Sequence, residues 1–130
     1  MILKPAVVVV DITGMGAPFS EFLQKKLPPV MPVTITRAVK ESLVKNLCST
    51  VLERKLIIPA DETTLIKQLR HFEQTFKDGH VRYGAPVGEH YDYVMALTLA
   101  VYGANFMKPR ADAAFFWRWT SPVHFPSQNK

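Results

Sequence analysis

Two carboxylates and one histidine occupy positions from which side chains can converge on a divalent cation. Asp11 follows the apolar run of residues 6–10, and His90 and Asp92 stand at the start of a later apolar segment. Ligands in open α/β sheets bind beyond the carboxyl ends of the strands, where Asp11 is expected. The dipole of a helix starting near residue 90 would keep Asp92 ionised. Because a hard divalent cation needs several oxygen ligands that converge from separate elements, the three residues together suggest a cation site more strongly than each does alone.

Each acid also has a purely structural interpretation. Asp11 precedes Ile-Thr-Gly, a context in which an aspartate satisfies the backbone of a turn. Asp92 would serve equally well as a helix cap. Phosphodiester hydrolysis by two ions needs them about 3.5–4 Å apart, one activating water and the other stabilising the leaving oxygen. Two carboxylates and a histidine are few ligands for that chemistry.

The apolar pattern of the first 40 residues predicts the unit that positions Asp11. The β-branched run 6–10 predicts a buried strand, and a helix is expected from Pro18 to the Pro28-Pro29 pair. Residues 33–36 predict a second strand. A strand, a helix and a strand in this span predict a parallel pair joined by a right-handed crossover.

Three more helices are expected further along the chain. Residues 38–54 predict an amphipathic helix whose apolar face includes Cys48 as a small core residue. A second helix is predicted over residues 65–76 and capped by Asp61, and a third over residues 89–106, buried centrally against the sheet. Between the last two, Lys77 to His80 predict a turn that leads into a brief strand at residues 81–83.

Composition sets the class of protein. A chain of 130 residues with 48% hydrophobic and 21% charged residues predicts one globular α/β domain. The formal charge of +5 favours a polyanionic partner, although a solvated basic surface is the ordinary alternative. One cysteine cannot form an internal disulfide, which indicates a reducing compartment. No apolar stretch approaches the roughly 20 residues that cross a bilayer, so no membrane association is expected.

Four segments in order resemble the nuclease domain at the C-terminal end of phage DNA-packaging terminase large subunits. They are residues 8–16 (VVVDITGMG), Lys40 near the start of a helix, residues 56–59 (LIIP) and residues 88–97 (GEHYDYVMAL). The resemblance implies a partial RNase H-like fold over residues 5–106, followed by an aromatic tail at 107–130. It also implies endonucleolytic cutting of double-stranded viral DNA with Mg²⁺ or Mn²⁺ in the bacterial host cytoplasm, and an ATPase motor domain earlier in the terminase.

The resemblance assigns roles to individual residues. Asp11 matches the second metal-binding acid of the family, Asp92 matches the last, and His90 matches the histidine that often precedes it. Lys40 and Arg37 are expected to hold backbone phosphates of DNA. Tyr91 occupies the first of two positions where the family usually has adjacent acids. No residue matches the first catalytic acid, which the family carries on a strand upstream of the one that ends at Asp11.

Without the family's upstream strand, the strand at residues 6–10 lacks a neighbour on one edge, which predicts that another strand pairs there. The strand at residues 6–10 carries no charge or proline, so its unpaired edge favours association. We expect a homo-oligomer formed through that edge, a substitute strand from elsewhere in the chain, or an upstream terminase segment in another polypeptide.

Two other classes of protein compete with this interpretation. A non-catalytic DNA-binding or assembly module would keep the RNase H-like fold without the metal site. A nucleotide-binding domain, suggested by Gly14-Met15-Gly16, ranks last because the third glycine and the phosphate lysine are missing at the needed spacing.

Overall fold

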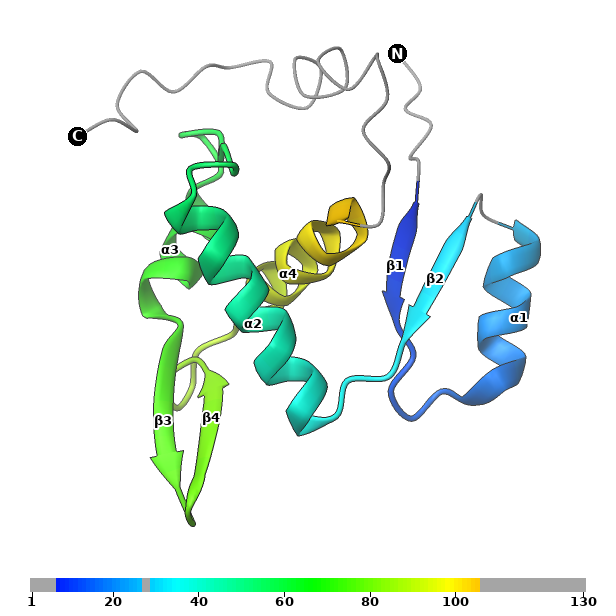
Figure 1. Cartoon of the computed structure of the whole chain (residues 1–130), viewed down its shortest axis with the longest axis horizontal. Coiled ribbons are helices and arrows are strands. Elements are labelled where there is room, and N and C mark those ends of the chain that lie inside the picture. The colour runs from blue at the N-terminus through cyan, green and yellow to red at the C-terminus, as the bar shows by residue number, and fades with distance from the viewer. Residues whose placement is uncertain (1–6, 27–28, 106–130) are drawn as a thin grey trace.

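The computed structural model describes residues 7–26 and 29–105. Helices and strands are mixed along the chain, which confirms the predicted α/β class (Figure 1). The elements are β1 (Val8–Asp11), α1 (Gly16–Lys26), β2 (Val30–Val33), α2 (Arg37–Leu52), α3 (Thr63–His71), β3 (Glu73–Lys77), β4 (His80–Gly84) and α4 (Asp92–Asn105).

Strands β1 and β2 form the predicted parallel pair. Their register places Val8 opposite Val30 and Asp11 opposite Val33. The Ile12 amide extends the pairing by donating to the Val33 carbonyl oxygen at 2.9 Å. The second strand was expected at residues 33–36 and lies earlier, because this register pairs the apolar residues 30–33 with β1.

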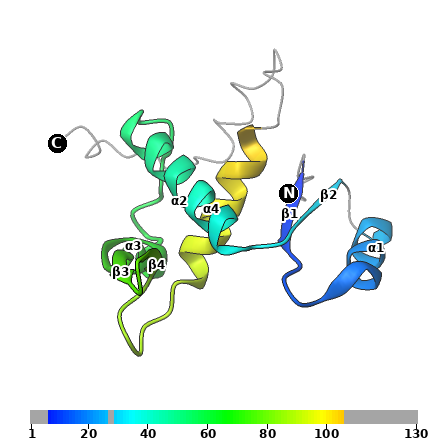
Figure 2. The ribbon, with the colours of Figure 1, turned by 60° about the horizontal axis from the view of Figure 1, so that its bottom comes forward.

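Helix α4 is the buried centre of the molecule, as predicted. It lies between α2 on one side and β1 on the other (Figures 1 and 2). Val94 and Thr98 are fully buried, and Val94 packs in the core with Leu47 of α2. A Cβ added to Gly103 would lie 2.6 Å from Cγ2 of Val9, so only glycine allows α4 to approach β1 this closely. The C-terminal part of α4 is therefore the part held against the sheet.

The segment after α3 differs from the prediction. The helix expected over residues 65–76 ends at His71, and residues 73–77 pair with β4 in an antiparallel hairpin. Asp78 and Gly79 both have positive φ, 53° and 77°, the backbone of a tight two-residue hairpin turn. The apolar residue Phe76 fitted the helical period, but its side chain is 75% exposed on β3. Asp61 does not cap α3 as predicted. The N-cap position is Glu62, and its side chain makes no capping hydrogen bond.

Apolar side chains in the last turns of helix α2 are exposed. Its core residues Leu43, Val44 and Leu47 are buried as expected. Cys48 is exposed, which corrects the prediction of a core residue. The reason is that α2 packs mainly against α4 and β4, which leave the side of its C-terminal end that carries Cys48 and Leu52 exposed.

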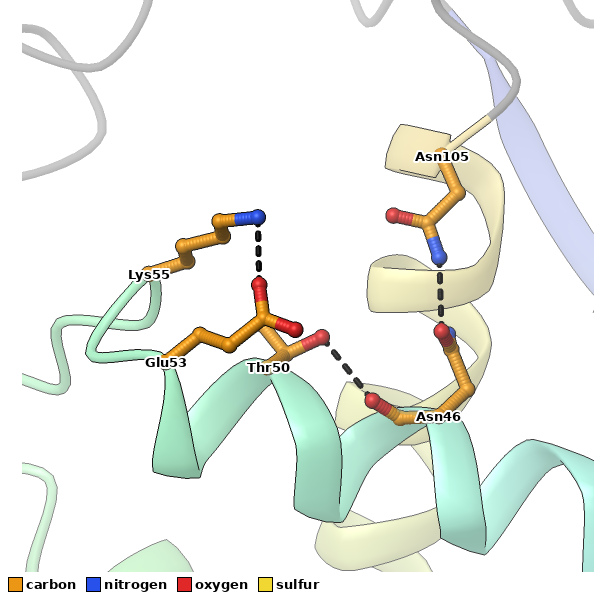
Figure 3. Close-up of polar contacts among 5 residues, drawn as sticks. All are labelled: Asn46, Thr50, Glu53, Lys55 and Asn105. Atoms are coloured by element: carbon orange, nitrogen blue, oxygen red, sulfur yellow. Dashed lines mark hydrogen bonds and ion pairs between the residues drawn. The ribbon is translucent and has the colours of Figure 1, made fainter.

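Two asparagines link the middle of α2 to the C-terminal end of α4. Nδ2 of Asn105 donates to Oδ1 of Asn46 at 2.8 Å, and the Thr50 hydroxyl donates to the Asn46 carbonyl oxygen at 2.9 Å (Figure 3). The end of α4 is thereby fixed beside α2.

Several expectations fall on residues that the structure does not describe. The aromatic tail at 107–130, with Phe115, Phe116, Trp117 and Trp119, lies outside the described residues, as does Ala6 at the start of the first predicted strand. Among residues 7–26 and 29–105, no helix has the length and apolar character needed to cross a membrane.

Candidate metal and DNA-binding site

Asp11 is exposed at the carboxyl end of β1, where the β-branched strand runs into a loop. Its Oδ1 accepts hydrogen bonds from the Thr13 amide at 2.8 Å and from the Thr13 hydroxyl. Oγ1 of Thr13 in turn accepts from the Ile35 amide at 2.9 Å. The turn interpretation of Asp11 therefore describes one of its oxygens. Oδ2 makes no hydrogen bond within the described residues and is open to a cation.

His90 and Asp92 lie together at the start of α4, and both are exposed. Asp92 is the acidic residue of the first turn, where the helix dipole stabilises a negative charge. Helix α3 fixes this end of α4, because Oε1 of Gln68 accepts from the Tyr93 amide at 2.9 Å. His71 of α3 also contacts Glu89, with 2.5 Å between Nδ1 and Oε2.

The described residues do not assemble these side chains into a metal site. Within residues 7–26 and 29–105, no three His, Cys, Asp or Glu side chains are grouped so that they could hold a metal ion. Helix α4 meets β1 at Gly103, about 16 Å along the helix axis from Asp92. The residues present are thus an incomplete ligand set for a two-metal centre, and the roles of Asp11, His90 and Asp92 stay predictions.

Lys40 has a partner that the sequence did not reveal. Its Nζ donates to the phenol oxygen of Tyr91 at 3.1 Å and lies 4.4 Å from the centre of the Tyr91 ring. That ring also packs against Phe72, with 5.8 Å between centroids. The sequence feature that could have pointed to this contact is Tyr91 itself, a tyrosine where the family resemblance predicts an acid. Arg37, the first residue of α2, is exposed.

Two hollows border the region, and neither is lined by Asp11 or Asp92. A hollow of about 340 Å³ between α3 and the start of α4 is lined by Thr64, Lys67, Gln68, Gly88, Glu89 and His90. Another, of about 650 Å³, adjoins the loop after β1 and is lined by Ile12, Gly14, Gly16, Ala17, Ser20, Glu21 and Thr34. His90 lines the first of these hollows.

Comparison with known proteins defines the class of fold. The chain is similar to the large terminase nuclease from thermophilic phage G20c, solved with bound magnesium, with a TM-score of 0.66 and 30% sequence identity. The match covers 74% of this chain and 51% of that structure, so this chain spans about half the length of its structural relative. No family model and no curated protein sequence matches the chain.

The fold is therefore that of a terminase nuclease domain, and the chain carries a partial RNase H-like architecture of this kind. This confirms the predicted resemblance and the predicted fold class. A terminase nuclease-like role is supported, and the structural relative binds magnesium.

Proposed function

We propose that this chain supplies part of a metal-dependent endonuclease centre that cuts double-stranded viral DNA during packaging. The similarity to a magnesium-bound terminase nuclease over 74% of the chain carries the proposal. The positions of the two acids add to it, since Asp11 ends a parallel strand and Asp92 begins the buried helix. The nuclease domain would extend over residues 5–106, with residues 107–130 as a tail.

Asp11 and Asp92 would contribute carboxylate oxygens to Mg²⁺ or Mn²⁺, and His90 an imidazole nitrogen. Since these groups are not assembled within the described residues, the centre needs further ligands from outside them. We propose that an upstream terminase segment, associated with the ATPase domain, supplies them. Packaging would place this assembly in the cytoplasm of the bacterial host.

Arg37 is the better placed of the two proposed phosphate-binding residues. Its side chain is exposed at the start of α2, whereas Lys40 is half-buried and bound to Tyr91. Each phosphate that a protein neutralises lowers the slope of log affinity against log salt by about 0.9. Arg37→Glu is therefore expected to weaken DNA binding and to flatten that slope by about one unit. Lys25→Glu, on α1, is the matched control.

Manganese binding tests the metal assignment in the full chain. Paramagnetic broadening of amide signals around both Asp11 and Asp92, at the same Mn²⁺ concentration, would show that one site uses both acids. Because only two carboxylates are assigned to the site, calorimetry should give an affinity weaker than about 1 µM, reduced further in Asp92→Asn. Asp61→Asn, which removes an exposed acid elsewhere, should bind as the wild type does. Unchanged binding in Asp92→Asn, or sub-micromolar affinity, would overturn the assignment.

A non-catalytic DNA-binding or assembly module is the second candidate, favoured by the missing group of three ligands within the described residues. It predicts DNA binding that depends on Arg37, together with no broadening at Asp11 or Asp92. The manganese experiment therefore separates the two functions.

A further inference from the structure

The last turns of α2 present an apolar patch that nothing in the described part of the chain covers. Leu52 is 82% exposed and Val51 is 50% exposed, and Cys48 beside them is also exposed. Spacings of three and four residues put Cys48, Val51 and Leu52 on one side of the helix. We call these three residues the α2 end patch. Contiguous exposed apolar side chains commonly mark a contact surface.

The chain leaves the described structure beside α2, the helix that carries this patch. Asn105, the last residue of α4, is hydrogen-bonded through its side chain to Asn46 of α2 at 2.8 Å (Figure 3). From Asn46 to Leu52 the helix rises only about 9 Å. At 3.6 residues per turn the α2 end patch lies on the opposite side of α2 from Asn46, so a segment that follows Asn105 must also pass around the helix, which is about 10–12 Å across.

The chain that follows has the composition to cover the patch. Its most aromatic stretch is residues 115–119, which contains Phe115, Phe116, Trp117 and Trp119. The ten residues from Asn105 to Phe115 can span up to about 33 Å when extended, enough to cover the rise along α2 and to pass around the helix. We propose that the aromatic segment 115–119 docks on the α2 end patch. This goes beyond the proposed nuclease function and is independent of it.

A tethered segment suits this patch better than a second copy does. Three side chains offer far less than the area of about 1,000 Å² that a specific interface between separate proteins needs. A short tether raises the effective concentration of the segment to the millimolar range, where a small apolar contact forms. Another apolar surface is formed by Met15, just before α1, and by Phe19 and Phe22 of α1, a helix that lies beyond β2 from α2 and α4 (Figure 1).

The chain contains its own probes for the test. Its two tryptophans are Trp117 and Trp119, so tryptophan emission reports only on the aromatic segment. In the folded full-length chain we expect emission shifted to the blue of the urea-unfolded chain. Leu52→Asp should return the emission to the unfolded position while far-ultraviolet circular dichroism stays unchanged. Phe22→Asp on α1, also an exposed apolar residue, should leave the emission as in the wild type.

The thiol of Cys48, the chain's one cysteine, gives a second readout, which reports on the α2 end patch and not on the aromatic segment. Cys48 lies in the patch, so replacing Trp117 and Trp119 by serine in the full chain should speed the reaction of Cys48 with a disulfide reagent several-fold. Wild-type emission at the unfolded position, or a shift caused by Phe22→Asp and not by Leu52→Asp, would overturn the proposal. A blue shift that disappears on dilution would assign the patch to a second copy and overturn it as well.

Discussion

The ammonium group of Lys40 lies 3.1 Å from the phenol oxygen of Tyr91 and 4.4 Å from the centre of its ring. This contact joins α2 to the residue immediately before Asp92. The resemblance to terminase nucleases predicts an acid at the position of Tyr91, next to Asp92. Here the lysine that we predict to bind phosphate also contacts an aromatic ring. Lys40 therefore positions the start of α4.

Replacing either member of this pair should destabilise the fold to different degrees. Lys40→Met removes both the hydrogen bond and the cation–π contact, and should cost about 1–2 kcal/mol in the free energy of unfolding. Tyr91→Phe keeps the ring and should cost about half as much. Urea unfolding measures both, with Lys67→Met on exposed α3 as the control. Equal stability of Lys40→Met and the wild type would show that the contact contributes nothing.

Gly103→Ala should destabilise the chain although alanine favours a helix. The added Cβ would lie 2.6 Å from Cγ2 of Val9 and 3.2 Å from Cγ1 of Val7. Overpacking of this kind costs about 1–3 kcal/mol, more than the roughly 1 kcal/mol that alanine gains over glycine in a helix. Thermal or urea unfolding measures the loss.

A double-mutant cycle identifies the cause of that loss. Val9→Ala removes the methyl group that the new Cβ would meet, so the double variant should be more stable than the sum of the single effects by about 1 kcal/mol. Additive effects would mean that α4 and β1 are not in the close contact described.

The isolated chain should not nick supercoiled plasmid above background in Mg²⁺ or Mn²⁺. The reason is the incomplete ligand set among residues 7–26 and 29–105. An agarose gel measures conversion to the open circular form, with Asp11→Asn as the control for a contaminating nuclease. Robust nicking that Asp11→Asn abolishes would show that an acid outside our assignment completes the site.

Strand β1 should drive self-association through its second edge. The amides of Val8 and Ile12 donate to the carbonyl oxygens of Pro29 and Val33 at 2.9 Å. Because successive backbone groups alternate in direction, the amides of Val9 and Asp11 point away from β2. No strand pairs with them within the described residues. A two-fold dimer formed by strand addition would satisfy these groups.

Light scattering over a wide concentration range measures this association. Val8→Lys should weaken it, since the added charge leaves every backbone donor in place. Val7 and Val9 are unsuitable positions, because both side chains face Gly103 of α4. A chain that stays monomeric while the Val9 and Asp11 amides resist hydrogen exchange would show that the edge is covered from within.

Much of the fold was predictable because local pattern determines it. A β-branched run ending in Asp11 specifies a strand and its loop, and the parallel pairing with β2 follows from the short helix between them. The apolar period of residues 38–54 and the nearly uniform apolar character after residue 92 specify α2 and the buried α4. The resemblance to terminase nucleases also came from sequence order alone, and the structural match confirms it.

Tertiary contacts decided what local pattern left open. Phe76 fits a helical period, yet cross-strand pairing with Val81 places it in a hairpin, because several ladder bonds outweigh one weak helical preference. Cys48 shares the apolar period of α2 but is exposed, because burial depends on which neighbours reach that turn. The sequence likewise placed Asp11 and Asp92 at the ends of their elements. How close the two acids come depends on where α4 crosses β1, and Gly103 fixes that crossing near the far end of the helix from Asp92.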